Sequence, residues 1–365
     1  MTRPRSRSAM VLAAGRGTRM RSARPKPIHL ICGRPMAMYV LDSLVELGVE
    51  RAVVVVGHGA EQVSKTLNDL APAELRLDFV EQVVQRGTGD AVTVGLGAFE
   101  GHEIDDEDAD LLVLPGDTPL LKADTLAELV RVHVEEGAGA TVLTARIEDP
   151  TGYGRVIRGG DGRVLRIVEH GDASDEERAV DEVNTSVYCF RRSLLPAALR
   201  LVDAGNAQGE YYLTDVIEVL RNAGYPIAAV EASDAAETAG VNDRQQLAVC
   251  EGEMRRRTNR GWMAAGVTML DPEATYIDTT VRLAPDVTIF PNTLLQGDCV
   301  VGEGAEIGPD VRLVDTVVGA RSRVQSTVAT EADIGEDCRV GPYAVLHSGE
   351  QLASGRVTGP FFSST

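Results

Sequence analysis

Residues 11–26 read VLAAGRGTRMRSARPK, a short apolar run that passes directly into a loop rich in glycine and positive charge. The apolar run Met10 to Ala14 predicts a buried strand. Gly15 and Gly17 let the backbone after it turn its N–H groups toward phosphate oxygens. The cations that accompany them are Arg16, Arg19 and Lys26. The stretch therefore predicts a strand followed by a loop that holds the phosphates of a nucleotide.

Taken alone, this loop has a second interpretation. It matches neither the dinucleotide pattern GxGxxG nor the P-loop pattern GxxxxGK[ST], so it is also compatible with an ordinary tight turn between a strand and a helix. The longer string favours a nucleotide site: LAAGRGTRM at 12–20 is followed by PKPIH at 25–29, with a proline on each side of Lys26.

LAAGRGTRM followed by PKPIH resembles the signature of the sugar nucleotidyltransferases, which join a sugar 1-phosphate to a nucleoside triphosphate. Within that family, nearly the whole chain resembles the bacterial N-acetylglucosamine-1-phosphate uridylyltransferases, which form the N-terminal half of a bifunctional uridylyltransferase/acetyltransferase. The resemblance implies an enzyme that forms UDP-N-acetylglucosamine and pyrophosphate from UTP and N-acetylglucosamine 1-phosphate, with Mg²⁺ as cofactor.

The composition limits the kinds of partner. The chain has 365 residues, of which 44% are hydrophobic, and a net charge of −19, which argues against nucleic acid. The cations clustered at its start point to a small anionic ligand, although a solvated basic N-terminus is the alternative. Its five cysteines form no CxxC pair, and no segment approaches the length of a membrane span. We expect a cytoplasmic protein without membrane contact.

The first two thirds of the chain alternate between two kinds of segment. Apolar runs at 52–56, 111–114 and 140–145 predict strands, and amphipathic stretches at 36–47 and 125–134 predict helices. This βα alternation predicts an α/β fold, a Rossmann-like nucleotidyltransferase domain with a mostly parallel sheet.

After Thr280 the period changes to six residues. The recurring aliphatic residues are Ile289, Leu295, Val301, Ile307, Leu313, Val318, Val324, Ile334, Val340 and Leu346. Several are followed by glycine, which is typical of hexapeptide repeats in a left-handed parallel β-helix. At about eighteen residues a coil, we expect about four coils. We predict a nucleotidyltransferase domain at 1–243, a linking helix at 244–265 and a short β-helix domain at 266–365.

Two polar residues are candidate magnesium ligands. Asp117 follows the predicted strand 111–114, and the carboxyl end of a parallel strand faces the ligand crevice. A carboxylate there suits Mg²⁺, which takes one or two protein oxygens together with phosphate oxygens and water. The alternative is an Asx turn before Pro119. The resemblance implies that Asp117 and Asn242 both bind the metal.

The resemblance also assigns the nucleotide site. It implies that Gln82, Gly87 and Thr88 hold the uracil ring, and a side-chain amide suits a pyrimidine edge because it can both donate and accept. It implies that five residues at the end of the first strand and in the glycine loop also bind the nucleotide: Leu12, Ala13, Ala14, Gly15 and Gly17. The usual GTGHA reads GTGDA here, so Asp90 replaces a histidine and could alter base choice.

The sugar side follows from the stretches TGYGRV, RIVEHGDA, DEVNTS and AQGEYYLTD. The resemblance implies that Gly154, Glu169 and Asn184 bind the hydroxyls and the N-acetyl group, although Glu169 and Asn184 taken singly would read as surface residues. Gly171 stands where the family has a lysine, and Ser186 stands where it has a glycine. The lost lysine could weaken binding of the sugar phosphate.

The predicted chemistry is an in-line attack by a sugar 1-phosphate oxygen on the α-phosphorus of the triphosphate, with pyrophosphate leaving. The nucleophile is already an anion, so no general base is required. Catalysis then depends on bringing two polyanions together, and we expect Arg19 and Lys26 to be the catalytic cations.

The second domain departs from the bifunctional pattern. AVLHSG places His347 and Ser348 where the family has an arginine and a proline, and no segment matches its catalytic histidine motif. We therefore expect no acetyltransferase activity. We expect the short β-helix to assemble a homotrimer, with a monomer as the alternative.

Two other functions remain open at this stage. Asp90, Gly171 and Ser186 would permit a nucleotidyltransferase for a different sugar or cyclitol 1-phosphate or a different base. A catalytically silent binding or regulatory protein would keep the fold alone, but the set Arg19, Lys26, Asp117 and Asn242 argues against it.

Overall fold

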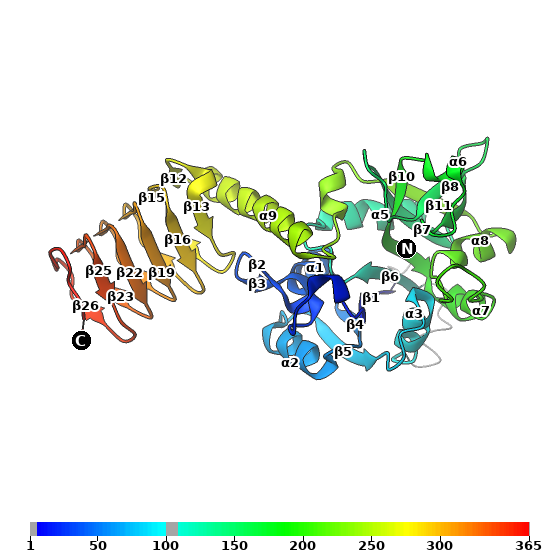
Figure 1. Ribbon diagram of the computed structural model, residues 1–365, viewed down its shortest axis with the longest axis horizontal. Helices are drawn as coiled ribbons and strands as arrows, with labels where there is room; N and C mark the ends of the chain where they lie inside the picture. The colour runs from blue at the N-terminus through cyan, green and yellow to red at the C-terminus, as the bar shows by residue number, and fades with distance from the viewer. Residues whose placement is uncertain (1–5, 100–108, 365) are drawn as a thin grey trace, which may run out of the picture. The chain divides into compact units, whose positions relative to one another are not determined.

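The computed structural model describes residues 6–99 and 109–364. The chain forms two compact units (Figure 1). The first contains the residues up to His29 and Pro35–Gln246, and the second contains Leu30–Arg34 and the residues from Leu247 onward. Each unit has its own core, so each is described by itself.

A nine-stranded mixed sheet forms the centre of the first unit. Its main path runs β11-β7-β10-β6-β1-β4-β5, with β8 paired to β10 and β9 to β8. Pairing is parallel from β6 through β1 and β4 to β5, and antiparallel around β10. The strands are β1 (Ser6–Ala13), β4 (Arg51–Val56), β5 (Arg76–Glu81), β6 (Ala109–Pro115), β7 (Ala140–Arg146), β8 (Arg155–Arg158), β9 (Val164–Val168), β10 (Glu182–Arg191) and β11 (Ile227–Glu231). A short ladder pairs β2 (Leu30–Ile31) with β3 (Arg34–Pro35).

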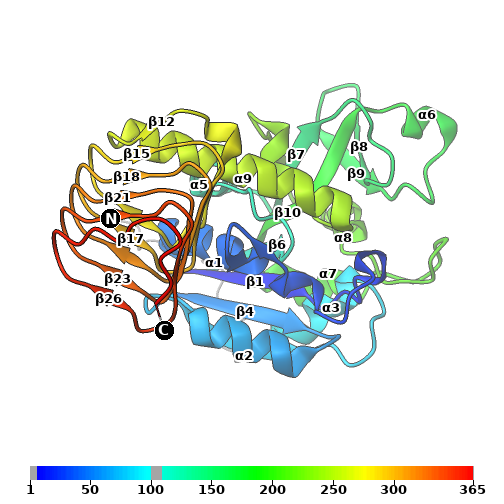
Figure 2. The same ribbon diagram turned by 60° about the vertical axis from the view of Figure 1, so that its left-hand side comes forward.

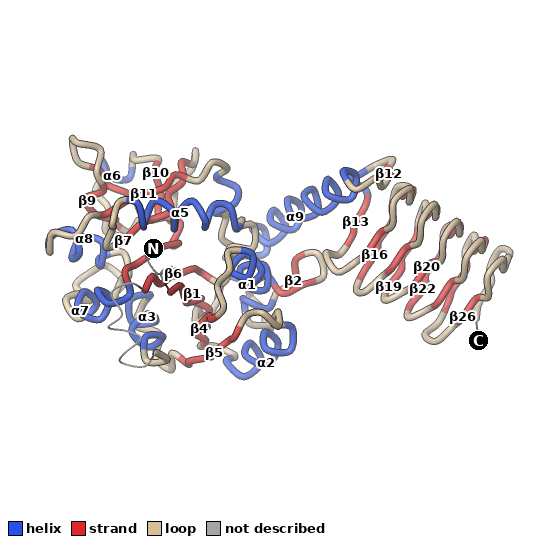
Figure 3. The backbone as a smooth tube through the Cα atoms, turned by 180° about the vertical axis from the view of Figure 1, so that it is seen from behind, coloured by secondary structure: helices blue, strands red, loops and turns tan. Residues whose placement is uncertain are grey.

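Helices cover both faces of this sheet, as the helices and strands of Figure 3 show. They are α1 (Met36–Glu46), α2 (Ala60–Leu70), α3 (Thr88–Leu96), α5 (Ala123–Glu135), α6 (Asp175–Arg178), α7 (Leu195–Leu199) and α8 (Asp215–Asn222). Neighbours in β1 point to opposite faces, so Val11 packs in the core with α1, α2 and α5, and Met10 packs in the core with α3, α7 and α8. Burial on both faces explains why the parallel strands read as unbroken apolar runs.

These observations confirm the predicted fold class. The predicted strands are present as β4, β6 and β7, and the predicted helices as α1 and α5. A long helix, α9 (Arg244–Ala264), covers the segment that was expected to link the two domains. Among the helices of residues 6–99 and 109–364, none combines the length and the apolar character needed to cross a bilayer.

The second unit is a left-handed parallel β-helix, whose stacked coils are visible in Figure 2. Its strands form three parallel sheets of five. The first sheet contains β12 (Thr268–Met269), β15 (Thr288–Ile289), β18 (Glu306–Ile307), β21 (Arg323–Val324) and β24 (Arg339–Val340). The second contains β13 (Thr275–Ile277), β16 (Thr293–Gln296), β19 (Val311–Val314), β22 (Thr327–Thr330) and β25 (Ala344–Leu346). The third contains β14 (Arg282–Leu283), β17 (Val300–Val301), β20 (Val317–Val318), β23 (Asp333–Ile334) and β26 (Gln351–Leu352).

The six-residue rhythm corresponds to the core of these coils. All ten predicted aliphatic positions are buried, from Ile289 to Leu346. The expected number of coils was too low, because each sheet has five strands rather than about four. The first coil does not follow the six-residue pattern, because the 3₁₀ turn Pro272–Ala274 separates Met269 from Ile277 by eight positions instead of six.

Three glycines keep the coils in contact at one corner. Gly302, Gly319 and Gly335 each directly follow a strand of the third sheet. A Cβ atom on Gly319 would lie 2.5 Å from the carbonyl carbon of Gly335, and one on Gly302 would lie 2.6 Å from the nitrogen of Ala320. Backbone of the next coil occupies the space that a side chain would need.

Gly319→Ala is therefore expected to destabilise the β-helix by about 1–3 kcal/mol, because overpacking forces the coils apart. Gly160→Ala is the control, since Gly160 has open space around its missing Cβ. Thermal unfolding followed by circular dichroism measures both. A G319A protein that melts with the parent would contradict this account of the corner.

Candidate active site

The first unit contains a cavity of about 700 Å³ beside the ends of β1 and β6. Carboxyl ends of parallel strands meet at one edge of a sheet, and loops from this edge line the cavity. The predicted residues that it brings together are Leu12, Ala13, Ala14, Gly15, Gly17, Lys26, Gln82, Gly87, Thr88, Asp117 and Glu169. Arg19, Gly154, Asn184 and Asn242 lie outside this lining set.

The glycine loop turns sharply at Gly17. Its φ of +57° lies in the left-handed region, and a Cβ there would come within 2.9 Å of the Lys26 Cβ. The loop then enters a 3₁₀ turn, Thr18–Met20, whose exposed Arg19 lies outside the cavity lining. Arg16 does line the cavity, so this loop cation is at the site.

Lys26 connects the loop region to the candidate metal ligands. Its ammonium forms an ion pair with Asp117 and donates to the Asn242 Oδ1 over 2.9 Å. The N–H of Val241 donates to the Asp117 carbonyl over 2.9 Å, which holds the segment of Asn242 beside the end of β6. Asn242 is therefore not a lining residue, but it contacts Lys26, which is one.

The oxygens around Lys26 fit a divalent cation. A carboxylate from Asp117 and an amide oxygen from Asn242 already converge on one positive group. Mg²⁺ is bound through one or two protein oxygens when phosphate supplies the others. Within residues 6–99 and 109–364, no cluster of three or more His, Cys, Asp or Glu side chains could enclose a metal.

The next part of the cavity is formed where β5 leads into α3. Gln82 directly follows β5 and is only 3% exposed. Gly87 has a φ of +113°, and a Cβ there would lie 2.5 Å from the Tyr211 carbonyl oxygen. Thr88 begins α3, and its Oγ1 accepts from the N–H of Leu213 over 3.0 Å.

Asp90, the departure from the family pattern, does not face the cavity. Its Oδ2 accepts from the Gln82 Nε2 over 2.8 Å, and its Oδ1 accepts from the Arg86 Nη2 over 2.7 Å. The substituted carboxylate therefore acts on Gln82 and pairs with a cation.

The opposite part of the cavity carries carboxylates. Glu169 lines it and accepts from the Thr214 Oγ1 over 3.1 Å, and burial raises the pKa of Glu169 above its usual value. A Cβ on Gly154 would lie 3.5 Å from both oxygens of Glu169, so Gly154 adjoins the same carboxylate. Asn184 is buried, and its Nδ2 donates to the Tyr188 hydroxyl over 2.7 Å.

Ser186 adopts the left-handed backbone conformation that glycine favours, which explains why the family pattern has a glycine at this position. Its φ is +62°, and its N–H donates to the Asn184 Oδ1 over 3.1 Å. The pairing of β10 with β7 shifts register between Asn184 and Tyr188, so this backbone turns Ser186 toward the cavity. Gly171 is exposed and lies outside the lining set.

Sequence reasoning missed several lining residues, namely Thr18, Gln85, Tyr188, Glu210, Leu213 and Thr214. Thr18 lies in the glycine loop that was predicted, whereas Tyr188 belongs to no motif and reaches the cavity only through the fold. For Glu210, Leu213 and Thr214 a signal existed, because the stretch AQGEYYLTD at 207–215 marks their segment without singling out any residue.

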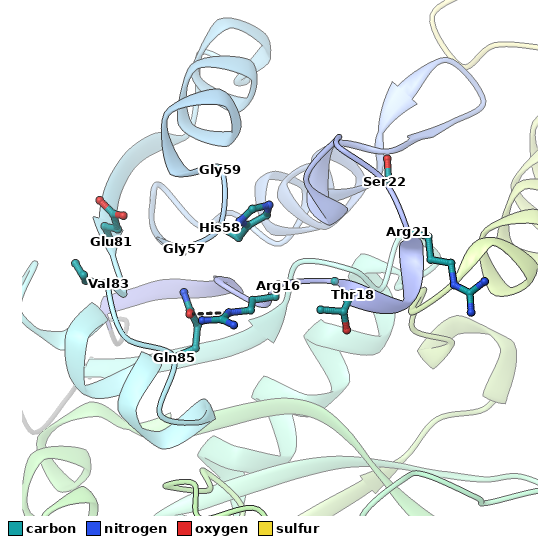
Figure 4. A pocket seen from close by; sticks show the side chains of 11 residues that line it. Arg16, Thr18, Arg21, Ser22, Gly57, His58, Gly59, Glu81, Val83 and Gln85 are labelled. Carbon is teal, nitrogen blue, oxygen red and sulfur yellow. Dashed lines mark hydrogen bonds between the residues drawn. The ribbon is translucent and has the colours of Figure 1, made fainter.

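A second hollow of about 650 Å³ lies on the outer side of the glycine loop (Figure 4). Figure 4 shows Arg16 bonded to Gln85 and His58 on the opposite side, in the turn before α2. Arg16, Gly17, Thr18 and Gln85 line both hollows. The glycine loop therefore contributes to two neighbouring hollows, and Arg16 lines both.

A family model described as nucleotidyl transferase matches residues 8–267. The chain belongs to the nucleotidyl transferase family. It is also 43% identical over 355 residues to a bifunctional protein GlmU of Heliobacterium modesticaldum, covering 97% of this chain and 75% of the relative. A bifunctional protein GlmU of Streptomyces avermitilis is 46% identical over 362 residues, covering 99% of this chain and 74% of the relative. The predicted resemblance is confirmed, and this nucleotidyl transferase is an enzyme of the sugar-1-phosphate type.

Glu169→Gln is expected to stabilise the folded nucleotidyl transferase at alkaline pH and to weaken its binding of the sugar 1-phosphate. Because the folded pKa of Glu169 is raised, its carboxyl favours the folded state most at acidic pH, and that contribution falls as pH rises through the folded pKa. E169Q should therefore raise the melting temperature at pH 8 but not near pH 4. The KM for the sugar 1-phosphate should rise by about tenfold, because a charged hydrogen-bond acceptor is lost.

The control is Glu136→Gln, which makes the same change at an exposed position after α5. Differential scanning fluorimetry across pH and steady-state kinetics measure both variants. An E169Q protein with an unchanged KM would remove Glu169 from the sugar site.

Proposed function

We propose that this enzyme transfers the uridylyl group of UTP to N-acetylglucosamine 1-phosphate, releasing pyrophosphate and forming UDP-N-acetylglucosamine. One observation supports it above others: a single cavity combines a glycine loop, a lysine bound to carboxylate and amide oxygens, and a glutamine amide. These are groups for phosphate, for a cation and for a base edge. The relatives named bifunctional protein GlmU support the same assignment.

The proposed chemistry is phosphoryl transfer by positioning and charge. An oxygen of the sugar 1-phosphate attacks the α-phosphorus, the new P–O bond forms, and the bond to the pyrophosphate oxygen breaks. No proton has to be removed from the nucleophile. Lys26 and the amides of the glycine loop stabilise the charge that builds on the α-phosphate, and Arg16 and Arg19 attract the triphosphate.

Asp117 and Asn242 would hold Mg²⁺ in this proposal. When bound, the ion neutralises phosphate charge and aligns the phosphate oxygens. Lys26 contacts both of those side chains, so the lysine that would stabilise the α-phosphate lies directly beside the residues that would hold the ion.

The carboxylate side of the cavity would receive the sugar. Glu169 and Thr214 line it, and fixed acceptors and hydroxyls of this kind pair with sugar hydroxyls. This arrangement keeps negative charge at the uncharged end of the acceptor and positive charge at its phosphate.

The β-helix unit would assemble a cytoplasmic homotrimer. Val300 and Val317 pair in register on adjacent coils and are 40% and 43% exposed, so they form apolar surface that a second copy would cover. Sedimentation velocity tests this, and a species of one 39.0 kDa chain would contradict it.

Acetyl transfer is not included in the proposal. His347 and Ser348 are both exposed at the positions where the resemblance implies an arginine and a proline, and the Ser348 hydroxyl donates to Glu331. Acetyl transfer from acetyl-CoA to glucosamine 1-phosphate by the purified chain would overturn this exclusion.

Pyrophosphate release tests the proposed function directly. The purified protein with Mg²⁺ is assayed against four nucleoside triphosphates, each with N-acetylglucosamine 1-phosphate and glucose 1-phosphate. The expected result is a dominant rate with UTP and N-acetylglucosamine 1-phosphate. A dominant rate at another combination would support the alternative of a different sugar or base, and no release at any combination would contradict the proposal.

A further inference from the structure

The amide of Gln82 is held in one orientation. Its Nε2 donates to the Asp90 Oδ2 over 2.8 Å and to the Gly87 carbonyl oxygen over 3.1 Å. An amide nitrogen carries two hydrogens, so these two bonds use both. The group that Gln82 has left for a ligand in the cavity is its Oε1.

The reversed amide would be unfavourable. It would place the Oε1 against two oxygens that can only accept, the carboxylate of Asp90 and the carbonyl of Gly87. Gln82 is 3% exposed and Asp90 is 6% exposed, so water cannot easily replace the lost bonds. A histidine at position 90 could donate or accept, whereas a carboxylate fixes the direction.

Asp90 is itself fixed. It lies in the first turn of α3, and the Arg86 Nη2 donates to its Oδ1 over 2.7 Å. The backbone of Arg86 is held in turn, because its carbonyl accepts from the N–H of Tyr211 over 2.8 Å, and the Arg86 guanidinium lies over the Tyr211 ring at 6.0 Å from its centroid. The direction of the Gln82 amide is therefore set by a chain of bonds that begins outside the cavity.

We propose that Asp90 is a positioning residue that selects the nucleobase by holding the Gln82 Oε1 toward the cavity as an acceptor. This inference rests on the proposed function, because it assumes that the base lies against Gln82. An Oε1 acceptor matches a ring imide N–H, which uracil carries at N3. Cytosine has a bare N3 with a lone pair, which would face the Oε1 and be repelled. The site thus favours UTP over CTP.

Asp90→Asn tests the direction of the amide with little change in shape. Arg86 can only donate, so it would bind the side-chain oxygen of the substituted asparagine and leave the amide nitrogen of that side chain facing Gln82. An unreversed Gln82 amide would then set its Nε2 against that amide nitrogen and keep only the bond to the Gly87 carbonyl, whereas a reversed amide would accept from the asparagine and lose the Gly87 bond. The two orientations become comparable in energy, so the Nε2 can turn to the cavity, where it suits the N3 of cytosine. We expect the preference for UTP over CTP to fall by about tenfold or more, mainly through tighter CTP binding.

Isothermal titration calorimetry with UTP and CTP measures the preference, and pyrophosphate release measures the kcat/KM ratio. The KM for N-acetylglucosamine 1-phosphate should stay near that of the parent, which a general disturbance of the fold would not allow. Asp78→Asn is the matched control, since Asp78 on β5 is also bound by an arginine, Arg51, but lies outside the cavity lining. D78N should leave the preference unchanged.

A D90N protein that keeps the preference of the parent overturns the inference, as does a parent that binds UTP and CTP equally. If D90N does not fold, Asp90→Ser removes the carboxylate with a smaller side chain, and a fall in the preference in the same direction is expected, smaller because the Gly87 carbonyl still accepts from the Gln82 Nε2. The same experiments test the proposed reaction independently of the role of Asp90. A fall in preference without turnover of any nucleotide would support the role of Asp90 and contradict the proposed reaction.

Discussion

The ammonium group of Lys26 holds together three segments that are distant in the sequence. It binds Asp117 at the end of β6 and Asn242 just before α9, while the glycine loop packs against its side chain. The close approach at Gly17, where a Cβ would fall 2.9 Å from Lys26, makes the loop conformation and the lysine position depend on each other. The arrangement of phosphate loop and candidate metal ligands follows from this one set of contacts.

Charge is distributed unevenly around the cavity, and this distribution would orient an acceptor with its phosphate toward the cations and its sugar toward the carboxylates. Arg16 and Lys26 line the cavity at the glycine loop, whereas Glu169 lines it beside Gly154 and Thr214. Carboxylates near one another also affect Asp215, whose pKa burial raises to about 6, with Asp203, Glu218 and Asp172 adding to the rise. The raised pKa means that ionised Asp215 lowers the stability of the fold at neutral pH.

Much of this molecule could be predicted from local sequence patterns. The βα alternation, the glycine loop and the six-residue rhythm each reflect a short-range physical requirement: burial of a strand, freedom of the backbone, or stacking of coils. Asp117 could be placed because it follows an apolar strand closely. Asn242 could not be placed from its own surroundings, since only the fold brings it to Lys26, and the resemblance was required.

Other features depend on contacts that no pattern carries. The five residues Leu30–Arg34 group with the second unit, where the N–H of Cys32 donates to the Glu251 Oε2 over 2.8 Å. The sequence did not decide what Asp90 does, because only the three-dimensional structure identifies its partners Gln82 and Arg86.

The most direct test of the account is the turnover of Lys26→Ala, compared with Lys65→Ala, which removes an exposed lysine of α2. The measurement is pyrophosphate release together with the melting temperature of each variant. We expect K26A to lose about 100-fold or more in kcat, since a charge-stabilising donor is removed, while K65A is unaffected. We also expect K26A to keep a folded structure. Near-normal turnover in a folded K26A protein would contradict the central role assigned to this lysine.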